Sequence, residues 1–251
     1  MHILAIILGV TLGIVLFLSI IALIIYGKIK LTMKRMGFKA NSFSDIAEEV
    51  EKIREEDSTR ARSISGMTSL LLPNIRSDFP DFNEQEMYNK TEDVLRKVFS
   101  AIENKNIEEV STLPLLRNSI EKVIEDYNTS NIEERYDDIH FHKFAIYQYK
   151  KKNGMATVTV SVSVEYYYQK KKEEKVLKDF TKYKKQTRYQ CKFIYVYDES
   201  KVDMSAKVLA INCPNCGAAI KALGHKYCDY CGTTVKEVNL KSWECSSYAE
   251  C

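Results

Sequence analysis

The chain has 251 residues, enough for one ordinary domain with appendages. Its 37 basic and 34 acidic side chains leave a formal net charge of only +3, which argues against a nucleic-acid partner held by a global basic field. Nine Gly and four Pro are too few for long disordered tracts. Sixteen Tyr and ten Phe favour abundant β-structure or an aromatic interface.

The chain opens with an uncharged apolar run from Ile3 to Tyr26. As a helix this run would be about 36 Å long, enough to cross a hydrocarbon core of roughly 30 Å. A cleaved signal peptide is the alternative, but the run lacks a basic leading region and a small-residue cleavage site. The pattern predicts a single transmembrane helix over residues 1–27.

Basic residues set the orientation expected for this helix. Five of them follow the run with no acidic residue among them: Lys28, Lys30, Lys34, Arg35 and Lys39. Positive charge beside a span stays on the cytoplasmic side. We therefore expect a single-pass protein of the cell membrane, with its N-terminus outside and its C-terminal domain in the cytoplasm. Three of the seven cysteines, Cys191, Cys245 and Cys251, lie outside paired motifs and suit such a reducing compartment.

A basic juxtamembrane segment and a spacer helix are expected over residues 28–62. Ser44 has the position of an N-cap, and acidic residues crowd the turns that follow. Arg60 and Arg62 would lie in the last turn, as the helix dipole favours. Apolar positions are sparse, which is typical of a solvated spacer; a partner-binding helix is the alternative.

Three helical patterns follow. In the first, apolar residues share one face until Pro73, which we expect to end the run. Phe79 and Phe82 flank Pro80, which predicts an extended segment that packs both rings on a core. Asn83 then begins a long helix with 3.6-residue periodicity, and Pro114 stands in the first turn of a third helix.

From Asp137 the period changes to two. Asn153-Gly154 joins two strand-like runs and is a strong hairpin signal. The second run alternates Val and Tyr with Thr and Ser, which predicts one covered face and one face open to solvent or a partner. A phase change between Phe141 and Phe144 predicts a bulge or bend in the first run.

A third strand is expected to end near Tyr197. The lysine-rich stretch before it, residues 169–185, is interpreted as a solvated hairpin tip, with contact to an anionic membrane surface as the alternative. Helices first and then a meander of antiparallel strands predict an α+β domain over residues 63–200, with helices packed on one face of a bent sheet.

The stretch SISGMTSLLLPNIRSDFPDFN, followed by a long helix, resembles the Tim-forty-four-like domain family over roughly Ser63 to Tyr248. The resemblance implies a nuclear-transport-factor-two-like fold, in which a cone of helices and a strongly bent sheet enclose an apolar pocket. Bacterial members look like this chain, with an N-terminal span and a zinc ribbon. The resemblance implies a binding or scaffolding role beside the membrane, linked to protein transport or assembly, and carries over no catalytic residue.

The C-terminal stretch CPNCGAAIKALGHKYCDYCG contains two Cys-x-x-Cys-Gly motifs eleven residues apart. Paired knuckles at this spacing predict a zinc ribbon over residues 208–235, with a closed set of four ligands: Cys213, Cys216, Cys228 and Cys231. With four sulfur ligands the Zn²⁺ would be structural, because no position is left for a catalytic water. A redox dithiol is the alternative, and His225 is expected outside the ligand set.

The ribbon carries little charge for holding nucleic acid. Lys221, Lys226 and His225 are its only basic residues between Cys213 and Gly232, too few for a phosphate backbone. Residues 236–251 read as a final strand that returns to the α+β domain. If this strand pairs with the one ending near Tyr197, the ribbon is an insertion that clasps two neighbouring strands.

The sequence offers only weak candidates for a catalytic site. His140 and His142 share a strand face and could begin a metal or acid–base site, but no third ligand lies near them in the sequence. We therefore expect a membrane-anchored, cytoplasm-facing scaffold rather than an enzyme, with a protein, peptide or lipid partner. The alternatives are a membrane-tethered enzyme that uses the cone pocket and a zinc-ribbon regulator that contacts nucleic acid.

Overall fold

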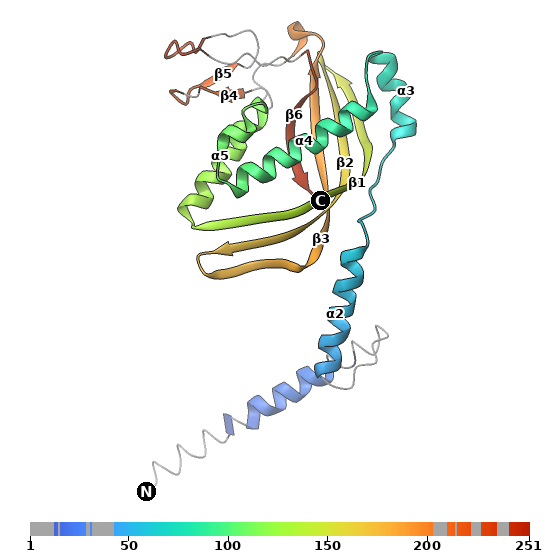
Figure 1. The fold of residues 1–251 in the computed structure, drawn as a ribbon, viewed down its shortest axis with the longest axis vertical. Helices are drawn as coiled ribbons and strands as arrows, with labels where there is room; N and C mark the ends of the chain where they lie inside the picture. Colours follow the sequence, from blue (N-terminus) through green and yellow to red (C-terminus); the bar gives the residue numbers. More distant parts are fainter. Residues whose placement is uncertain are drawn as a thin grey trace. The chain divides into compact units, whose positions relative to one another are not determined.

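The computed structural model describes residues 13–14, 16–28, 31, 43–202, 210–213, 215–221, 227–234 and 241–251 (Figure 1). These residues belong to two compact units, Met1–Glu56 and Asp57–Cys251.

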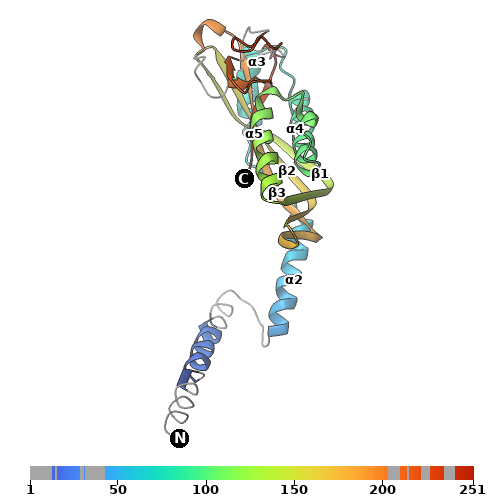
Figure 2. The same cartoon turned by 90° about the vertical axis from the view of Figure 1, so that its left-hand side faces the viewer.

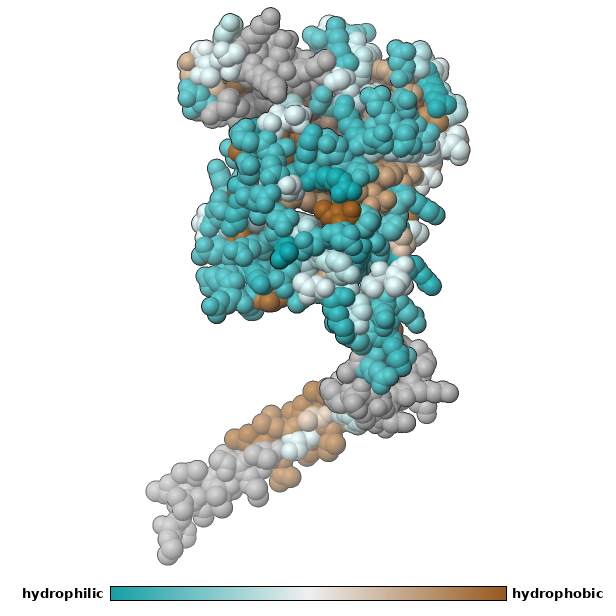
Figure 3. Space-filling view, viewed as in Figure 1, coloured by the Kyte–Doolittle hydropathy of each residue, from teal (hydrophilic) through white to brown (hydrophobic). Residues whose placement is uncertain are grey.

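The first unit contradicts the expected membrane span. Its described helical residues, 13–14 and 16–28, carry exposed apolar side chains (Figure 3). Among the described residues no helix is both long and apolar enough to cross a membrane. The transmembrane helix over 1–27 and the single-pass localisation in the cell membrane are therefore wrong for the described chain, and the rest of the run lies outside the described residues.

The expected spacer helix forms, with different ends. Helix α2 spans Phe43–Thr59, so Ser44 lies within the helix, and Arg60 and Arg62 follow its end. Lys52 and Glu48 form the exposed i,i+4 ion pair that the spacing favours, at 3.0 Å. The basic residues Lys30, Lys34, Arg35 and Lys39 lie outside the described residues.

The second unit confirms the α+β class. Its antiparallel sheet has the order β1-β2-β3-β6, built from β1 (Ile132–Lys152), β2 (Met155–Lys172), β3 (Lys175–Val196) and β6 (Glu244–Glu250). The helices are α3 (Thr68–Asp78), α4 (Glu84–Glu103) and α5 (Pro114–Thr129), with short 3-10 turns at Ile107–Val110 and Glu199–Lys201. Figure 2 shows α4 and α5 in a layer beside the sheet.

The core lies between these helices and the Val/Tyr face of β2. That face is fully buried from Val158 to Tyr166, against Leu95 and Phe99 of α4 and Ile120 of α5. Asn83 caps α4 by accepting a hydrogen bond from the backbone N–H of Glu86 at 3.1 Å, as expected. Pro73 was expected to end its helix, but it lies inside α3, which continues to Asp78. The fully buried Ile75 packs the turn after Pro73 into the core.

Irregular pairing bends the sheet. The register of β1 against β2 shifts between Phe141 and Lys143, which confirms the predicted bulge. A larger shift in β3 places Tyr166 opposite Lys185 but Tyr168 opposite Phe180. The lysine-rich stretch 169–185 forms the far end of the β2–β3 hairpin, as expected, with β2 running to Lys172 and β3 beginning at Lys175. Its side chains are exposed from residue 172 to residue 182, and the strands continue almost to the turn.

The Thr/Ser face of β2, expected to be open, is covered. Its buried residues are Thr159, Ser161 and Ser163. Residues 60–67, here named the strap, run over this face between the neighbouring strands. Arg62 Nε of the strap donates to the backbone carbonyl of Gln186 in β3 at 3.4 Å. In return, Arg188 of β3 donates to the backbone carbonyl of Ser63 in the strap at 3.3 Å.

The strap ends at the free edge of β1, where it pairs with Ile146. The N–H of Met67 donates to the Ile146 carbonyl at 2.8 Å, and the N–H of Ile146 donates to Thr68 Oγ1 at 2.9 Å. Gly66 lies against β1 so closely that an added Cβ would stand 2.2 Å from the Cβ of Ala145. Glycine is thus required by the close approach of two backbones.

Replacing Gly66 by alanine should therefore destabilise the domain. We expect Gly66→Ala to lower the free energy of unfolding by roughly 1–3 kcal/mol, because the strap must lift from β1. Chemical denaturation measures the change, with Ser65→Ala as the control in the exposed part of the strap. The double variant Gly66→Ala/Ala145→Gly should recover most of the loss. Equal losses with and without Ala145→Gly would refute this contact.

Candidate functional site

Two cysteine knuckles with the same backbone geometry form the clearest site. In the first, the N–H of Gly217 donates to the Cys213 carbonyl at 2.9 Å; in the second, Gly232 donates to the Cys228 carbonyl at the same distance. Both glycines have φ of +71°, a conformation that favours glycine at this turn. Each knuckle presents its two sulfur atoms to the other.

The four sulfur atoms form a compact cluster of the size that a metal ion requires. Cys213 Sγ lies 3.5 Å from Cys231 Sγ, and Cys216 Sγ lies 3.7 Å from Cys228 Sγ. All four sulfur atoms lie within 4.8 Å of one another. A tetrahedron with metal–sulfur bonds of about 2.3 Å has edges of about 3.8 Å. The four cysteines named from the sequence are therefore brought together in a geometry that fits a metal.

The polar surroundings favour the thiolate form of one ligand. The Thr233 hydroxyl lies 3.3 Å from Cys231 Sγ. Hydrogen bonding from this hydroxyl and from the Thr233 backbone lowers the pKa of Cys231 to about 5. Because metals bind the thiolate rather than the thiol, Cys231 is ready to act as a ligand near neutral pH.

The buried half of the cluster is built into the α+β domain. Cys213 and Cys228 are buried, whereas Cys216 and Cys231 are exposed. The buried pair packs with Ile194 and Val196 from the end of β3, and a small hydrophobic cluster completes the contact: Val202, Ile220, Leu115 and Met155. Leu115 belongs to α5 and Met155 to β2, so the cysteines contact a junction of several elements.

Strand pairing shows that the segment with the four cysteines connects β3 to β6. The short strands β4 (Ala210–Asn212) and β5 (Ala219–Lys221) pair antiparallel beside the first knuckle. The last strand, β6, pairs with β3 from Tyr189 to Ile194, which confirms the expected pairing. The cysteines thus lie in the connection between two adjacent strands. His225 lies outside the described residues.

The two histidines join one ionic network on the outer face of the sheet. His140 Nε2 lies 2.7 Å from Asp138, and His142 Nε2 lies 3.0 Å from Glu165. Lys184 Nζ links the two carboxylates at 2.7 and 3.0 Å. Gln186 donates to Glu165 and also to the Ser58 carbonyl, both at 2.6 Å. Each histidine thus has its own carboxylate partner, and the network ties β1, β2 and β3 together near the strap.

A second ionisable cluster lies on the inner face, around the buried Glu134. The hydroxyls of Tyr127, Tyr136 and Tyr168 donate to its carboxylate at 2.8, 2.5 and 2.9 Å. Lys170 Nζ forms an ion pair with it at 2.8 Å. Burial raises the pKa of Glu134, but the hydrogen bonds from Lys170 and the tyrosines outweigh burial and hold it below its ordinary value. Burial raises the pKa of Tyr136 and Tyr168, which keeps both as donors.

A cavity of about 450 Å³ was not foreseen from the sequence. It lies where Phe79 and Phe82, after α3, meet Tyr195 of β3 and Trp243. Trp243 immediately precedes β6 and lies far from Phe79 in the chain. The sequence does indicate that Phe79 and Phe82 pack inward, but nothing in its local pattern brings Trp243 to them.

Comparison with known proteins gives no family assignment: the chain matches no protein-family model and no curated protein.

The Glu134 cluster makes the stability of the domain dependent on pH. Because the pKa of Glu134 is lower in the folded protein, its contribution is complete above the unfolded-state pKa and is lost as the pH falls through the folded-state pKa. We expect Glu134→Gln to cost roughly 2–4 kcal/mol near neutral pH, since it leaves Lys170 without its charged partner. The cost should shrink as the pH falls below 4.5, the ordinary pKa of a glutamate.

Denaturant titrations across this pH range measure the effect. Glu133→Gln is the matched control, because Glu133 precedes Glu134 in the same strand and is exposed. A cost that stays constant with pH would contradict an ionised Glu134 in the folded domain.

Proposed function

We propose that residues 57–251 form a binding or scaffold domain in which the four cysteines hold a structural zinc ion. The observation that carries the proposal is the closed set of four sulfur atoms, two of them packed into the junction of β3, β2 and α5. Four protein ligands leave no position for a reactive water. The metal's role is then to stabilise the fold around it.

Zinc is the metal that this ligand set suits best. Tetrahedral sites with four cysteine sulfurs hold zinc or iron, and paired Cys-x-x-Cys knuckles are typical of structural zinc sites. The described residues around the cysteines are too few to make a core of their own. Metal binding would supply the free energy that fixes their conformation.

The zinc ion would act as a clasp between β3 and β6. Held against Ile194 and Val196, it would limit where the chain leaves β3 and where it returns. Trp243, at the return point, is a wall of the aromatic cavity. The clasp would thereby hold one wall of that cavity in place.

The resemblance to the Tim-forty-four-like domain supports the scaffold role. A layer of helices on a bent antiparallel sheet is the arrangement that the resemblance implies. By this proposal the domain gathers protein partners in transport or assembly. A pocket enzyme is less favoured: Phe99, Tyr136 and Tyr166 pack ring against ring on the inner face, and the Glu134 carboxylate already accepts three hydroxyl donors.

Metal analysis and thermal unfolding test the structural zinc. The purified chain should contain about one zinc ion, and Cys213→Ser should lose it. We expect the variant to lose roughly 3 kcal/mol of stability, or about 6–12 °C in Tm. Cys251→Ser is the control, because Cys251 is exposed and lies outside the cluster.

A linker that replaces residues 208–235 tests the clasp. An unchanged Tm in this deletion would refute the clasp, and iron in place of zinc would refute the metal assignment. Crosslinking followed by affinity purification tests the scaffold role. Recovery of no partner, together with turnover of a small molecule, would favour an enzyme instead.

A further inference from the structure

The aromatic cavity has the size and composition of a binding site. Its volume of about 450 Å³ lies within the range of roughly 300–1,000 Å³ that ligand pockets occupy. A second hollow of about 500 Å³ adjoins it and shares part of its lining: Pro80, Asp81, Phe82 and Asn83. Together the two hollows could accept one side chain and the peptide backbone on either side of it.

Four aromatic rings form the apolar walls. Trp243 is their centre, with ring centroids 5.3 Å from Phe79, 5.7 Å from Phe82 and 5.4 Å from Tyr195. Phe79 also contacts Tyr195 at 5.0 Å. Phe82 is buried and the other three rings are partly exposed, so ring surface remains accessible at this place.

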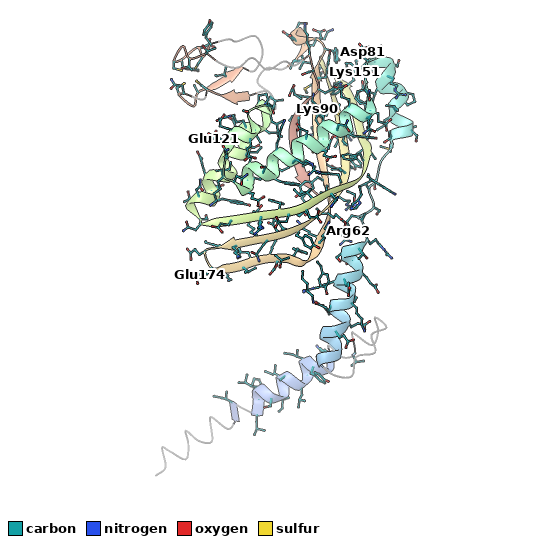
Figure 4. The ribbon with its side chains drawn as sticks, viewed as in Figure 1. Arg62, Asp81, Lys90, Glu121, Lys151 and Glu174 are labelled. Carbon is teal, nitrogen blue, oxygen red and sulfur yellow. The ribbon has the colours of Figure 1, made fainter. Side chains whose placement is uncertain are left out.

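Two carboxylates of the lining are available to pair with a cation. Asp81 and Glu86 are exposed, and their carboxylates form no hydrogen bond or ion pair within the described chain. The two lysines of the lining keep their charge but have partners of their own: Lys90 donates to the Trp243 backbone carbonyl at 2.7 Å, and Lys241 also has a partner. Asp78 is paired with Lys151. Figure 4 shows Asp81, Lys90 and Lys151 at the same end of the domain.

The protein already places one cation against a ring of this cavity, Phe79. Lys151 Nζ stands 5.6 Å from the ring centroid of Phe79 and 5.1 Å from that of Tyr197. Ammonium and guanidinium groups at such distances are attracted by the ring quadrupole. A second cation in the cavity would meet Phe79 and the other three rings of the lining, with Asp81 and Glu86 as its counter-ions.

We propose that this cavity binds an arginine side chain in an extended basic segment of a partner protein. A guanidinium group stacks on aromatic rings and pairs with carboxylates in a bidentate manner, which suits rings and acids side by side. The inference rests on the proposed binding role and names the chemistry of the partner. It does not depend on which metal the cysteines hold.

Tryptophan fluorescence gives a direct test, because Trp243 is the only tryptophan in the chain. The full chain is titrated with the capped peptide Gly-Gly-Arg-Gly-Gly and, separately, with Gly-Gly-Gln-Gly-Gly. The arginine peptide should change the emission saturably, and the glutamine peptide should not. Asp81→Asn/Glu86→Gln should weaken arginine binding about tenfold, since two counter-ions are lost.

The matched control is Glu121→Gln/Glu125→Gln, which removes the same charge from exposed positions on α5 (Figure 4). This control should bind the arginine peptide as the parent chain does. Equal weakening in both double variants would overturn the proposal, as would tighter binding of the glutamine peptide or no saturable response. Zinc content and Tm are measured on the same samples. If both are unchanged while arginine binding fails, the arginine site is refuted and the structural zinc is not.

Discussion

The central strand β2 is buried on both faces, and the rest of the domain is arranged around that constraint. Its Val/Tyr face requires an apolar cover, which α4 and α5 provide. Its Thr/Ser face carries hydroxyl groups and therefore needs a polar cover, which the backbone of the strap supplies. Ser163 Oγ and Gln186 Oε1 nevertheless lack a partner in the described chain, a cost of burying a polar strand face.

Local patterns predicted the elements that depend on neighbours in the sequence. The cap at Asn83, the helix start at Pro114, the Asn153-Gly154 hairpin and the bulge after Phe141 each follow from adjacent residues. Alternation in β2 could not reveal a covered polar face, because the strap comes from a segment about a hundred residues earlier. Hydropathy alone likewise predicted a membrane helix that the described residues do not form.

The candidate sites also divide into those formed by neighbouring residues and those formed by residues far apart in the sequence. The cysteines could be identified from the sequence because both knuckles are local and repeat one spacing. The aromatic cavity could not, since Phe79, Tyr195 and Trp243 meet only after the sheet has formed. The ionic network behaves in the same way: alternation placed His140 and His142 on one face, but Lys184 reaches their carboxylates through a register shift in β3.

The strap also defines where an independent domain can begin. A fragment starting after Met67 would retain the apolar core but leave the N–H···O bond at Ile146 unmade and the hydroxyl face of β2 bare. An open strand edge beside an uncovered face is a template for pairing with another chain. The eight residues from Arg60 to Met67 therefore belong to the smallest fragment that keeps this edge and face covered, although they lie in no helix or strand.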